Sequence, residues 1–233
     1  MTGEVTTVVL AKAPVPGRAK TRLCPPATPE QAAALASALL LDTLDAATAV
    51  PGGTVVALTG DLADAVGSAE LTARLAGVDV VAQRGDGLAA RIAAAHADAA
   101  ALHPGRPTQQ IGMDTPQAGP AVLARCADRL ADPGVDAVLG PATDGGWWVL
   151  GLRDPSAASA LAGVPMSCED TGERTLAALW AAGLRVAPAQ TLTDVDTAAD
   201  ALAVAREVPG SRFAACVAAL AGTLAAGVSG VAG

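Results

Sequence analysis

The sequence predicts an α/β protein, a three-layer sandwich in which a mainly parallel mixed sheet lies between two layers of helices. Short apolar runs of strand length alternate with longer segments of helical period along the chain, which is typical of β-α-β units. Apolar residues make up 52 % of the 233 residues and charged residues 16 %, which is enough for a sizeable core. We see no internal repeat or low-complexity linker, so a single domain over residues 1–233 is expected.

The strands are predicted from apolar runs bounded by Gly, Pro and polar residues. In chain order they are Val5–Ala11, Thr54–Thr59, Val78–Ala82, Gln109–Met113, Val135–Leu139, Trp147–Leu152 and Arg185–Pro188. Because ligands bind at the carboxyl ends of the strands in open parallel sheets, the loops that follow these runs are the first places to look for function.

The helices are predicted from start signals and from the 3.6-residue period. The first has Thr28 as its N-cap with Pro and Glu in the first turn, and the third repeats apolar residues at Leu88, Ile92, Ala95 and Ala99. In chain order the helices are Pro29–Val50, Ser68–Ala76, Asp86–Leu102, Pro120–Ala131, Glu173–Ala182 and Thr197–Glu207. The segment Phe213–Gly233 carries no charge, but its Ala, Gly and Ser content favours a docked terminal helix with a loose Ala/Gly-rich tail from about residue 222, not a membrane span.

Composition excludes some classes of function. The net charge of −8 argues against a nucleic-acid partner, which would require a basic face. The four cysteines are dispersed and form no C-x-x-C pair, which makes a zinc site improbable and favours reduced thiols. The first apolar run is too short for a signal peptide. A cytoplasmic protein is therefore expected.

A basic loop follows the first predicted strand and is the clearest functional signal. It places four of the chain's 15 Lys and Arg residues within a short Pro/Gly-containing segment, where free backbone N–H groups and cations suit a polyphosphate. An ordinary exposed basic loop is the alternative. The candidate nucleotide-binding residues here are Lys12, Pro16, Gly17, Arg18, Lys20, Thr21 and Arg22.

Three aspartates at predicted strand ends are candidate metal ligands. Asp114 follows the strand that ends near Met113, and Asp194 and Asp196 are two residues apart in extended chain, so their side chains point the same way. Two neighbouring carboxylates repel each other unless a cation lies between them. The alternatives are helix capping for Asp114 and Asp196 and a simple turn for Asp194.

The segment Gly140–Trp148 joins two predicted strands and is dense in turn-forming residues. Paired glycines allow close approach to a substrate, and Asp144 either acts on an acceptor or holds the loop. Trp147 and Trp148 point to opposite faces of a strand, so at most one lines a pocket. A tight hairpin is the alternative. The candidate acceptor-binding residues here are Thr143, Gly145, Gly146 and Trp147.

A fifth segment, Gln83–Leu88, lies between a strand and a helix. The side-chain amide of Gln83 and the flexible backbone at Gly87 suit the edge of a nucleobase, although a loop with a helix N-cap explains the segment equally well.

Taken in this order, the motifs resemble the bacterial glycosyltransferase-like proteins related to 2-phospho-L-lactate guanylyltransferase. The similarity runs from about Val8 to about Leu202. It is carried by Lys12-Ala13-Pro14-Val15-Pro16-Gly17 with Lys20-Thr21-Arg22-Leu23, by Gly112-x-Asp114-x-Pro116, by Gly140-Pro141-x-x-Asp144-Gly145-Gly146 and by Asp194-Val195-Asp196-Thr197.

The resemblance implies the nucleotide-diphospho-sugar transferase fold, called GT-A, with a nucleotide and Mg²⁺ or Mn²⁺. It implies that Asp114, Asp194 and Asp196 hold the metal, that the basic loop binds the phosphates and that Gln83–Leu88 binds the base. The chain departs from the family on the acceptor side, where Met166-Ser167-Cys168 replaces an aromatic-Ser-Thr stretch and Trp147 replaces a Tyr. Ser167 is included among the candidate acceptor-binding residues.

The leading hypothesis is a nucleotidyltransferase that joins an NMP from an NTP to a phosphorylated or acidic small molecule and releases pyrophosphate. In it Lys20 and Arg22 take the charge of the leaving group, Asp114 holds metal and Asp144 faces the acceptor. A glycosyltransferase with a nucleotide-sugar donor is the alternative, with Asp144, Glu169 or Asp170 as base. A nucleotide-binding module without catalysis is the second alternative.

Overall fold

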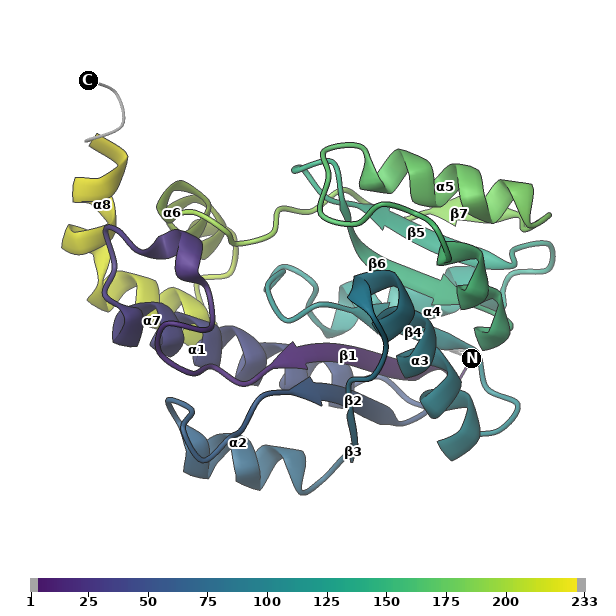
Figure 1. Cartoon of the computed structure of the whole chain (residues 1–233), viewed down its shortest axis with the longest axis horizontal. Helices are drawn as coiled ribbons and strands as arrows, with labels where there is room; N and C mark the ends of the chain where they lie inside the picture. The colour runs from purple at the N-terminus through teal and green to yellow at the C-terminus, as the bar shows by residue number, and fades with distance from the viewer. Residues whose placement is uncertain (1–3, 230–233) are drawn as a thin grey trace.

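The computed structural model describes residues 4–229, and their strands form one mixed seven-stranded sheet in the order β3-β2-β1-β4-β6-β5-β7 (Figure 1). Within this sheet β6 runs antiparallel to its neighbours β4 and β5, and the other pairs are parallel. The strands are β1 Thr6–Lys12, β2 Thr54–Thr59, β3 Asp79–Ala82, β4 Thr108–Ile111, β5 Ala137–Pro141, β6 Trp147–Leu152 and β7 Val186–Pro188. This is the expected mainly parallel arrangement.

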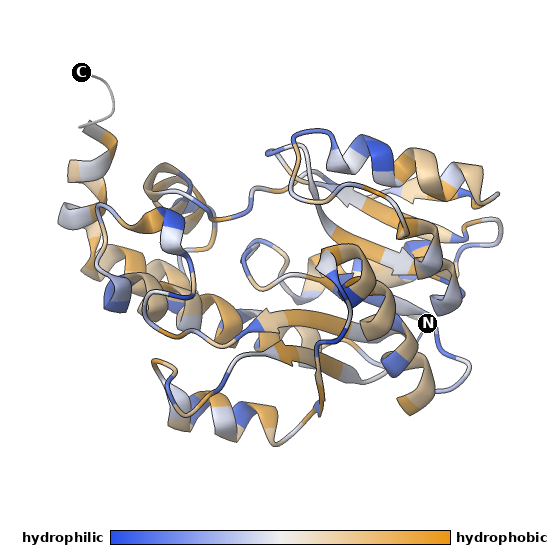
Figure 2. Ribbon diagram, viewed as in Figure 1, coloured by the Kyte–Doolittle hydropathy of each residue, from blue (hydrophilic) through white to orange (hydrophobic). Residues whose placement is uncertain are grey.

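Helices cover both faces of the sheet, so the expected three layers are present (Figure 1). On one face α1 (Pro29–Thr48), α2 (Ser68–Leu75) and α4 (Pro120–Ala131) pack on the strands. On the other lie α3 (Gly87–Leu102), the 3-10 segment η2 (Pro155–Leu161) and α5 (Thr171–Ala181). Apolar residues follow the strands in Figure 2, because the sheet is buried on both sides.

A second group of helices lies beside the sheet, at the left of Figure 1, and packs against α1. It consists of η1 (Thr21–Leu23), α6 (Ala198–Glu207), α7 (Arg212–Ala219) and α8 (Ala221–Ser229). The chain reaches α6 from β7 through residues 189–197, and this crossing brings Asp194 and Asp196 toward the end of β1. Over the described residues, no helix has the length and apolar character that a membrane crossing requires.

The C-terminal segment differs from its prediction. A loose tail was expected from about residue 222, but α8 continues to Ser229 because Leu224 is completely buried among α1, α6 and α7. Residues 230–233 of the predicted tail lie outside the described part of the chain.

Local signals located most helix starts. Thr28 caps α1 by accepting from the Gln31 backbone N–H, and Gln31 returns the bond in a capping box. Thr197 caps α6 in the same way with Asp200. The N-cap residue of α4 is Gly119 and that of α6 is Thr197. Neither Asp114 nor Asp196 therefore serves as a helix cap. The capping alternatives for these two aspartates are therefore wrong.

A buried histidine between α3 and β4 makes the fold sensitive to acid. His96 is fully buried, its Nδ1 lies 2.7 Å from the Thr108 hydroxyl, and burial lowers its pKa from 6.5 to about 4. The unfolded chain therefore binds a proton in a pH range where the folded chain does not. This contributes stability above pH 6.5, and the contribution is lost as pH falls from about 6.5 to about 4.

We therefore expect the free energy of unfolding to fall by about 2–4 kcal/mol over that pH range because of His96. The measurement is urea unfolding at a series of pH values. His96→Gln should flatten the dependence in that range. A wild-type slope in His96→Gln would assign the acid sensitivity to other groups.

Candidate functional site

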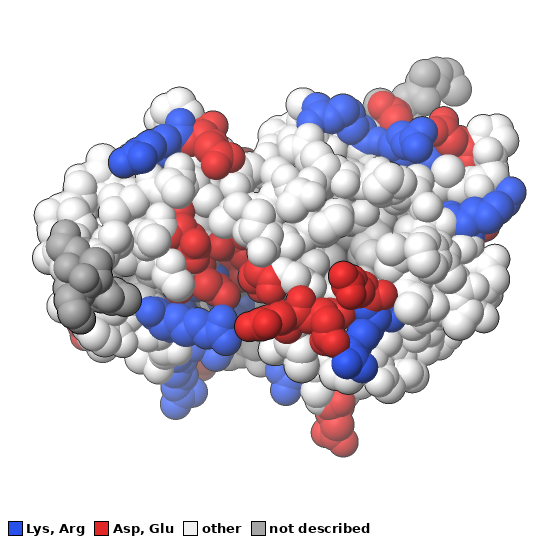
Figure 3. Space-filling model, turned by 90° about the horizontal axis from the view of Figure 1, so that it is seen from above, with Lys and Arg blue, Asp and Glu red and all other residues white. Residues whose placement is uncertain are grey.

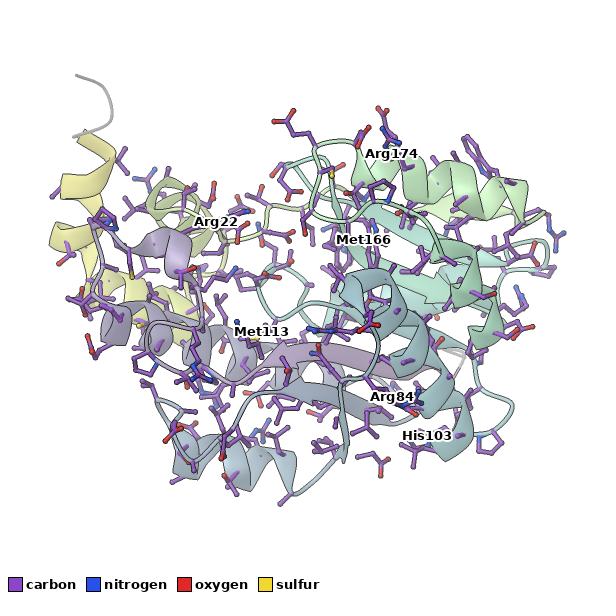
Figure 4. The ribbon with its side chains drawn as sticks, viewed as in Figure 1. Arg22, Arg84, His103, Met113, Met166 and Arg174 are labelled. Atoms are coloured by element: carbon purple, nitrogen blue, oxygen red, sulfur yellow. The ribbon has the colours of Figure 1, made fainter. Side chains whose placement is uncertain are left out.

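A cavity of about 560 Å³ opens at the carboxyl ends of β1 and β4, between the sheet and the helices that flank this edge. This is within the usual size range for a small-molecule site. Figure 3 shows the molecule from above, with acidic residues gathered across the middle of this face and basic residues beside them. Figure 4 places Arg22 on one side of the opening, Met166 on the other and Met113 between them, near the end of β4.

Lys20 joins the basic loop to two of the candidate metal ligands. Its Nζ donates to Asp114 Oδ2 and to Asp196 Oδ1, both at 2.9 Å, and its side chain is only 10 % exposed. Lys20 adopts the left-handed conformation at φ 49° directly before η1. Arg22 follows in η1 and donates from Nη1 to Asp196 Oδ2 at 3.0 Å. Two cations of the loop thus meet two carboxylates of the opposite wall.

The charges of this cluster stabilise one another. Burial alone would lower the pKa of Lys20, but the charges of Asp114 and Asp196 outweigh it and raise that pKa above its ordinary value. Burial of Asp196 is likewise outweighed by Lys20 and Arg22, so its pKa lies below the ordinary value. Lys20 and Asp196 are therefore both ionised at neutral pH.

Asp194 lies in the same region without an opposite charge of its own. Its carboxylate accepts a hydrogen bond from the Thr115 hydroxyl, and the Val195 N–H donates to the Asp114 carbonyl at 2.9 Å, which ties the two aspartate loops together. Burial raises the pKa of Asp194 to about 7, and the nearby charges of Asp114 and Asp144 add to the effect. An additional cation near Asp194 would relieve this repulsion.

The predicted metal ligands are of the chemical kind that binds a divalent cation, and two of them are engaged with Lys20. Aspartate oxygens are the donors that Mg²⁺ and Mn²⁺ prefer, and Lys20 Nζ already acts as a cation between two of the three. Over residues 4–229, however, no three His, Cys, Asp or Glu side chains are gathered closely enough to hold a metal ion. The assignment of Asp114, Asp194 and Asp196 as metal ligands stays a prediction, and a metal would have to displace Lys20 from two of them.

Most of the predicted site residues line this cavity. They are Lys12, Arg18, Lys20, Thr21, Arg22, Gln83, Asp114, Asp144, Gly146, Trp147, Ser167, Asp194 and Asp196. Five predicted residues do not line it: Pro16, Gly17, Gly87, Thr143 and Gly145. Gly145 has a structural role that is independent of the cavity. Its φ is 87°, and a Cβ at this position would lie 1.7 Å from the Glu169 carbonyl oxygen. The backbone at Gly145 thus packs directly against the segment that contains Glu169, and this close approach requires glycine.

Gln83 has a more restricted role than predicted. Its Nε2 donates to the carbonyls of Ala11 and Ala57, at 2.8 and 2.9 Å, and so ties the loop after β3 to β1 and β2. Both amide hydrogens are used by these bonds, which leaves only the side-chain oxygen to accept a hydrogen bond from a base.

Of the adjacent pair Trp147 and Trp148, one lines the cavity and the other does not, as expected. Trp147 lines the cavity and donates from Nε1 to the Thr175 hydroxyl at 3.1 Å, whereas Trp148 is buried in the core. Asp144 accepts from the Gly146 N–H at 2.8 Å, which fixes its carboxylate in the loop. Glu169 and Asp170, the other two candidate bases, do not line the cavity.

Sequence reasoning missed several lining residues on the inner faces of the elements. Leu10 lies on β1, Arg91 and Ile92 lie on α3, and Gln110 lies on β4. The apolar ones have the same character as core residues, so no sequence signal marks them. Gln110 was detectable, because a polar residue inside a buried strand is unusual.

Two kinds of comparison define the class of this protein. Residues 42–168 match the model of a family described as an uncharacterized protein conserved in bacteria (DUF2064), and the chain belongs to this family. The expected relationship is thereby confirmed. No curated protein matches the chain.

Solved structures confirm the GT-A type of fold. A "putative nucleotide-diphospho-sugar transferase" from Desulfovibrio desulfuricans G20 is 24 % identical with a TM-score of 0.83, over 95 % of this chain and 97 % of that chain. A CMP:2-keto-3-deoxy-manno-octonic acid synthetase complexed with CTP is 13 % identical, with a TM-score of 0.53 over 87 % and 97 % of the two chains. The mannosyltransferase PcManGT from Pyrobaculum calidifontis, in complex with GDP-Man and Mn²⁺, is 15 % identical, with a TM-score of 0.50 over 100 % and 80 %.

Proposed function

We propose that this protein is a metal-dependent nucleotidyltransferase that joins an NMP from an NTP to a small phosphorylated or acidic acceptor. The observation that supports this most is Lys20, a nearly buried ammonium that points from the basic loop at Asp114 and Asp196. Lys12, Arg18 and Arg22 line the same cavity, so the basic loop offers four cations to a bound polyphosphate. A triphosphate carries more negative charge than a diphosphate-sugar, and this favours an NTP as the donor.

In the proposed reaction an oxygen of the acceptor attacks the α-phosphorus of the NTP. The bond from that phosphorus to the bridging oxygen breaks, and pyrophosphate leaves with the electron pair. Lys20 and Arg22 neutralise the leaving group, and Asp144 orients the acceptor. When bound by Asp114, Asp194 and Asp196, Mg²⁺ or Mn²⁺ would supply further neutralisation of the phosphate charge. Lys20 must then exchange its carboxylate partners for phosphate oxygens.

Glycosyl transfer from a nucleotide-sugar is a second candidate, favoured by one observation. Of the three carboxylates considered as its base, Asp144 lines the cavity, on the side of Trp147 and Met166. A structurally similar protein in complex with GDP-Man and Mn²⁺ is a mannosyltransferase, so the fold accommodates this chemistry in that protein.

A pyrophosphate assay separates the two candidates. The protein is incubated with each NTP, Mg²⁺ and a panel of phosphorylated acids, and separately with nucleotide-sugars. We expect pyrophosphate release with one NTP–acceptor pair, in equal amount to the nucleotidyl product. Hydrolysis or transfer from a nucleotide-sugar without any pyrophosphate release would instead support glycosyl transfer.

A further inference from the structure

The inner end of the cavity contains a buried amide that neither the fold nor the phosphate chemistry uses. Gln110 lies in β4 between Val8 of β1 and Leu150 of β6, both completely buried, and is itself only 3 % exposed. It lines the cavity together with Leu10 and Ile92. Its Oε1 is buried and has no hydrogen-bond partner.

Unpaired buried groups are rare in native proteins, and this one is distinguished by its position. Over the described residues, four buried side-chain atoms have no partner: His96 Nε2 and the Oε1 atoms of Gln109, Gln110 and Gln117. Of these four residues, Gln110 is the one that lines the cavity. The neighbouring Gln109 points to the other face of the sheet, where its Nε2 donates to the Thr7 hydroxyl at 3.0 Å. The side chain of Gln110 therefore borders the cavity, and its buried amide oxygen lacks a partner.

The residues around Gln110 indicate which chemical groups a ligand at this position would carry. Four apolar lining residues, Leu10, Ile92, Met166 and Trp147, belong to one hydrophobic cluster beside Gln110, together with its strand neighbour Leu150. A compound that binds here presents apolar faces to the walls and one polar group to the amide. A hydroxyl group donates to an amide oxygen and accepts from an amide nitrogen, so it satisfies Gln110 in either orientation of the amide.

We propose that Gln110 determines acceptor specificity by binding a hydroxyl group of the acceptor, which is therefore a hydroxylated small molecule such as a sugar phosphate or a hydroxy acid. The proposal rests on the proposed function, because it assigns this end of the cavity to the acceptor. Gln110 positions the far end of the acceptor, while the reacting oxygen faces the phosphate-binding loop.

Thermal melting with matched ligand pairs tests the proposal. The probes are sugar 1-phosphates and hydroxy acids, each beside its O-methyl analogue. We expect at least one hydroxylated compound to raise the Tm of the wild type more than its analogue does, and Gln110→Met to abolish this difference. Without ligand, Gln110→Met should melt about 2–4 °C higher, since Met has a similar volume and leaves no unpaired oxygen. Its acceptor KM should rise about tenfold or more, with triphosphate affinity unchanged.

The matched control is Gln109→Met, a neighbouring buried glutamine that does not line the cavity. It loses the bond to Thr7, so its Tm should not rise, and it should keep the preference for hydroxylated probes. Equal shifts for both members of every pair in the wild type, or no shift at all, would overturn the proposal. This wild-type comparison decides the question even if Gln110→Met does not fold. An unchanged preference in a folded Gln110→Met would also overturn it.

The outcomes separate this proposal from the proposed function. Pyrophosphate release with an acceptor that lacks the hydroxyl would refute the role of Gln110 and support nucleotidyl transfer. A hydroxyl preference in melting without pyrophosphate release under any pairing would support the role of Gln110 and count against nucleotidyl transfer.

Discussion

Replacing Asp114 with Asn is expected to lower metal-dependent transfer by about 10²–10³-fold while the protein stays folded. Asn keeps the shape of the side chain but removes a charge that Lys20 contacts at 2.9 Å and that the proposed metal would require. Because the Asp114 side chain is 33 % exposed, the loss of this charge should change Tm by only a few degrees. Steady-state kinetics over a range of Mg²⁺ concentrations, together with melting curves, measure both effects.

The matched control is Asp132→Asn. Asp132 forms an exposed ion pair with Arg129 at 2.9 Å and does not line the cavity, so its variant should keep wild-type activity. Wild-type turnover in Asp114→Asn would contradict the metal assignment. A loss of folding in that variant would indicate instead that the ion pair with Lys20 is structural.

The variant Lys20→Met is expected to change two affinities in opposite directions. Triphosphate affinity should fall about tenfold to a hundredfold, because a charged hydrogen-bond donor to the phosphates is lost. Affinity for Mn²⁺ in the absence of nucleotide should rise, because Asp114 and Asp196 lose the ammonium that lies between them. Titration calorimetry with Mn²⁺ alone, and with the triphosphate alone, measures the two effects separately.

Lys12→Met is the control for this experiment. Lys12 lines the cavity on the same side, but no ion pair joins it to the aspartates in the described chain, so its loss should weaken triphosphate binding without strengthening Mn²⁺ binding. Unchanged Mn²⁺ affinity in Lys20→Met would show that the ammonium does not compete with metal. In that case the ion pairs of Lys20 with Asp114 and Asp196 would not limit metal binding.

Together these results would describe a site in which the Lys20 ammonium neutralises Asp114 and Asp196 until a triphosphate binds. Lys20 holds two carboxylates in place across the cavity, and a bound polyphosphate offers it a stronger partner. The metal proposed for the three aspartates would then bind with the nucleotide and not before it.

The amino-acid sequence by itself determined the fold class, the order of the elements and the position of the basic loop. These follow from local features, such as the alternation of apolar runs with helical period, the capping residues Thr28 and Thr197, and the basic segment directly after β1. Because backbone preference and burial period act over a few residues, they can be read without knowing the tertiary structure.

Only the tertiary structure decided how the candidate residues meet. The contact between Lys20 and Asp196 joins positions 176 apart in the chain, and it depends on the strand order and on the crossing from β7 to α6. The structure also assigned Gly145 to loop packing against Glu169 and brought the unpaired amide of Gln110 to the cavity. Contacts of this kind depend on distances between segments that are remote in sequence, and no local propensity encodes those distances.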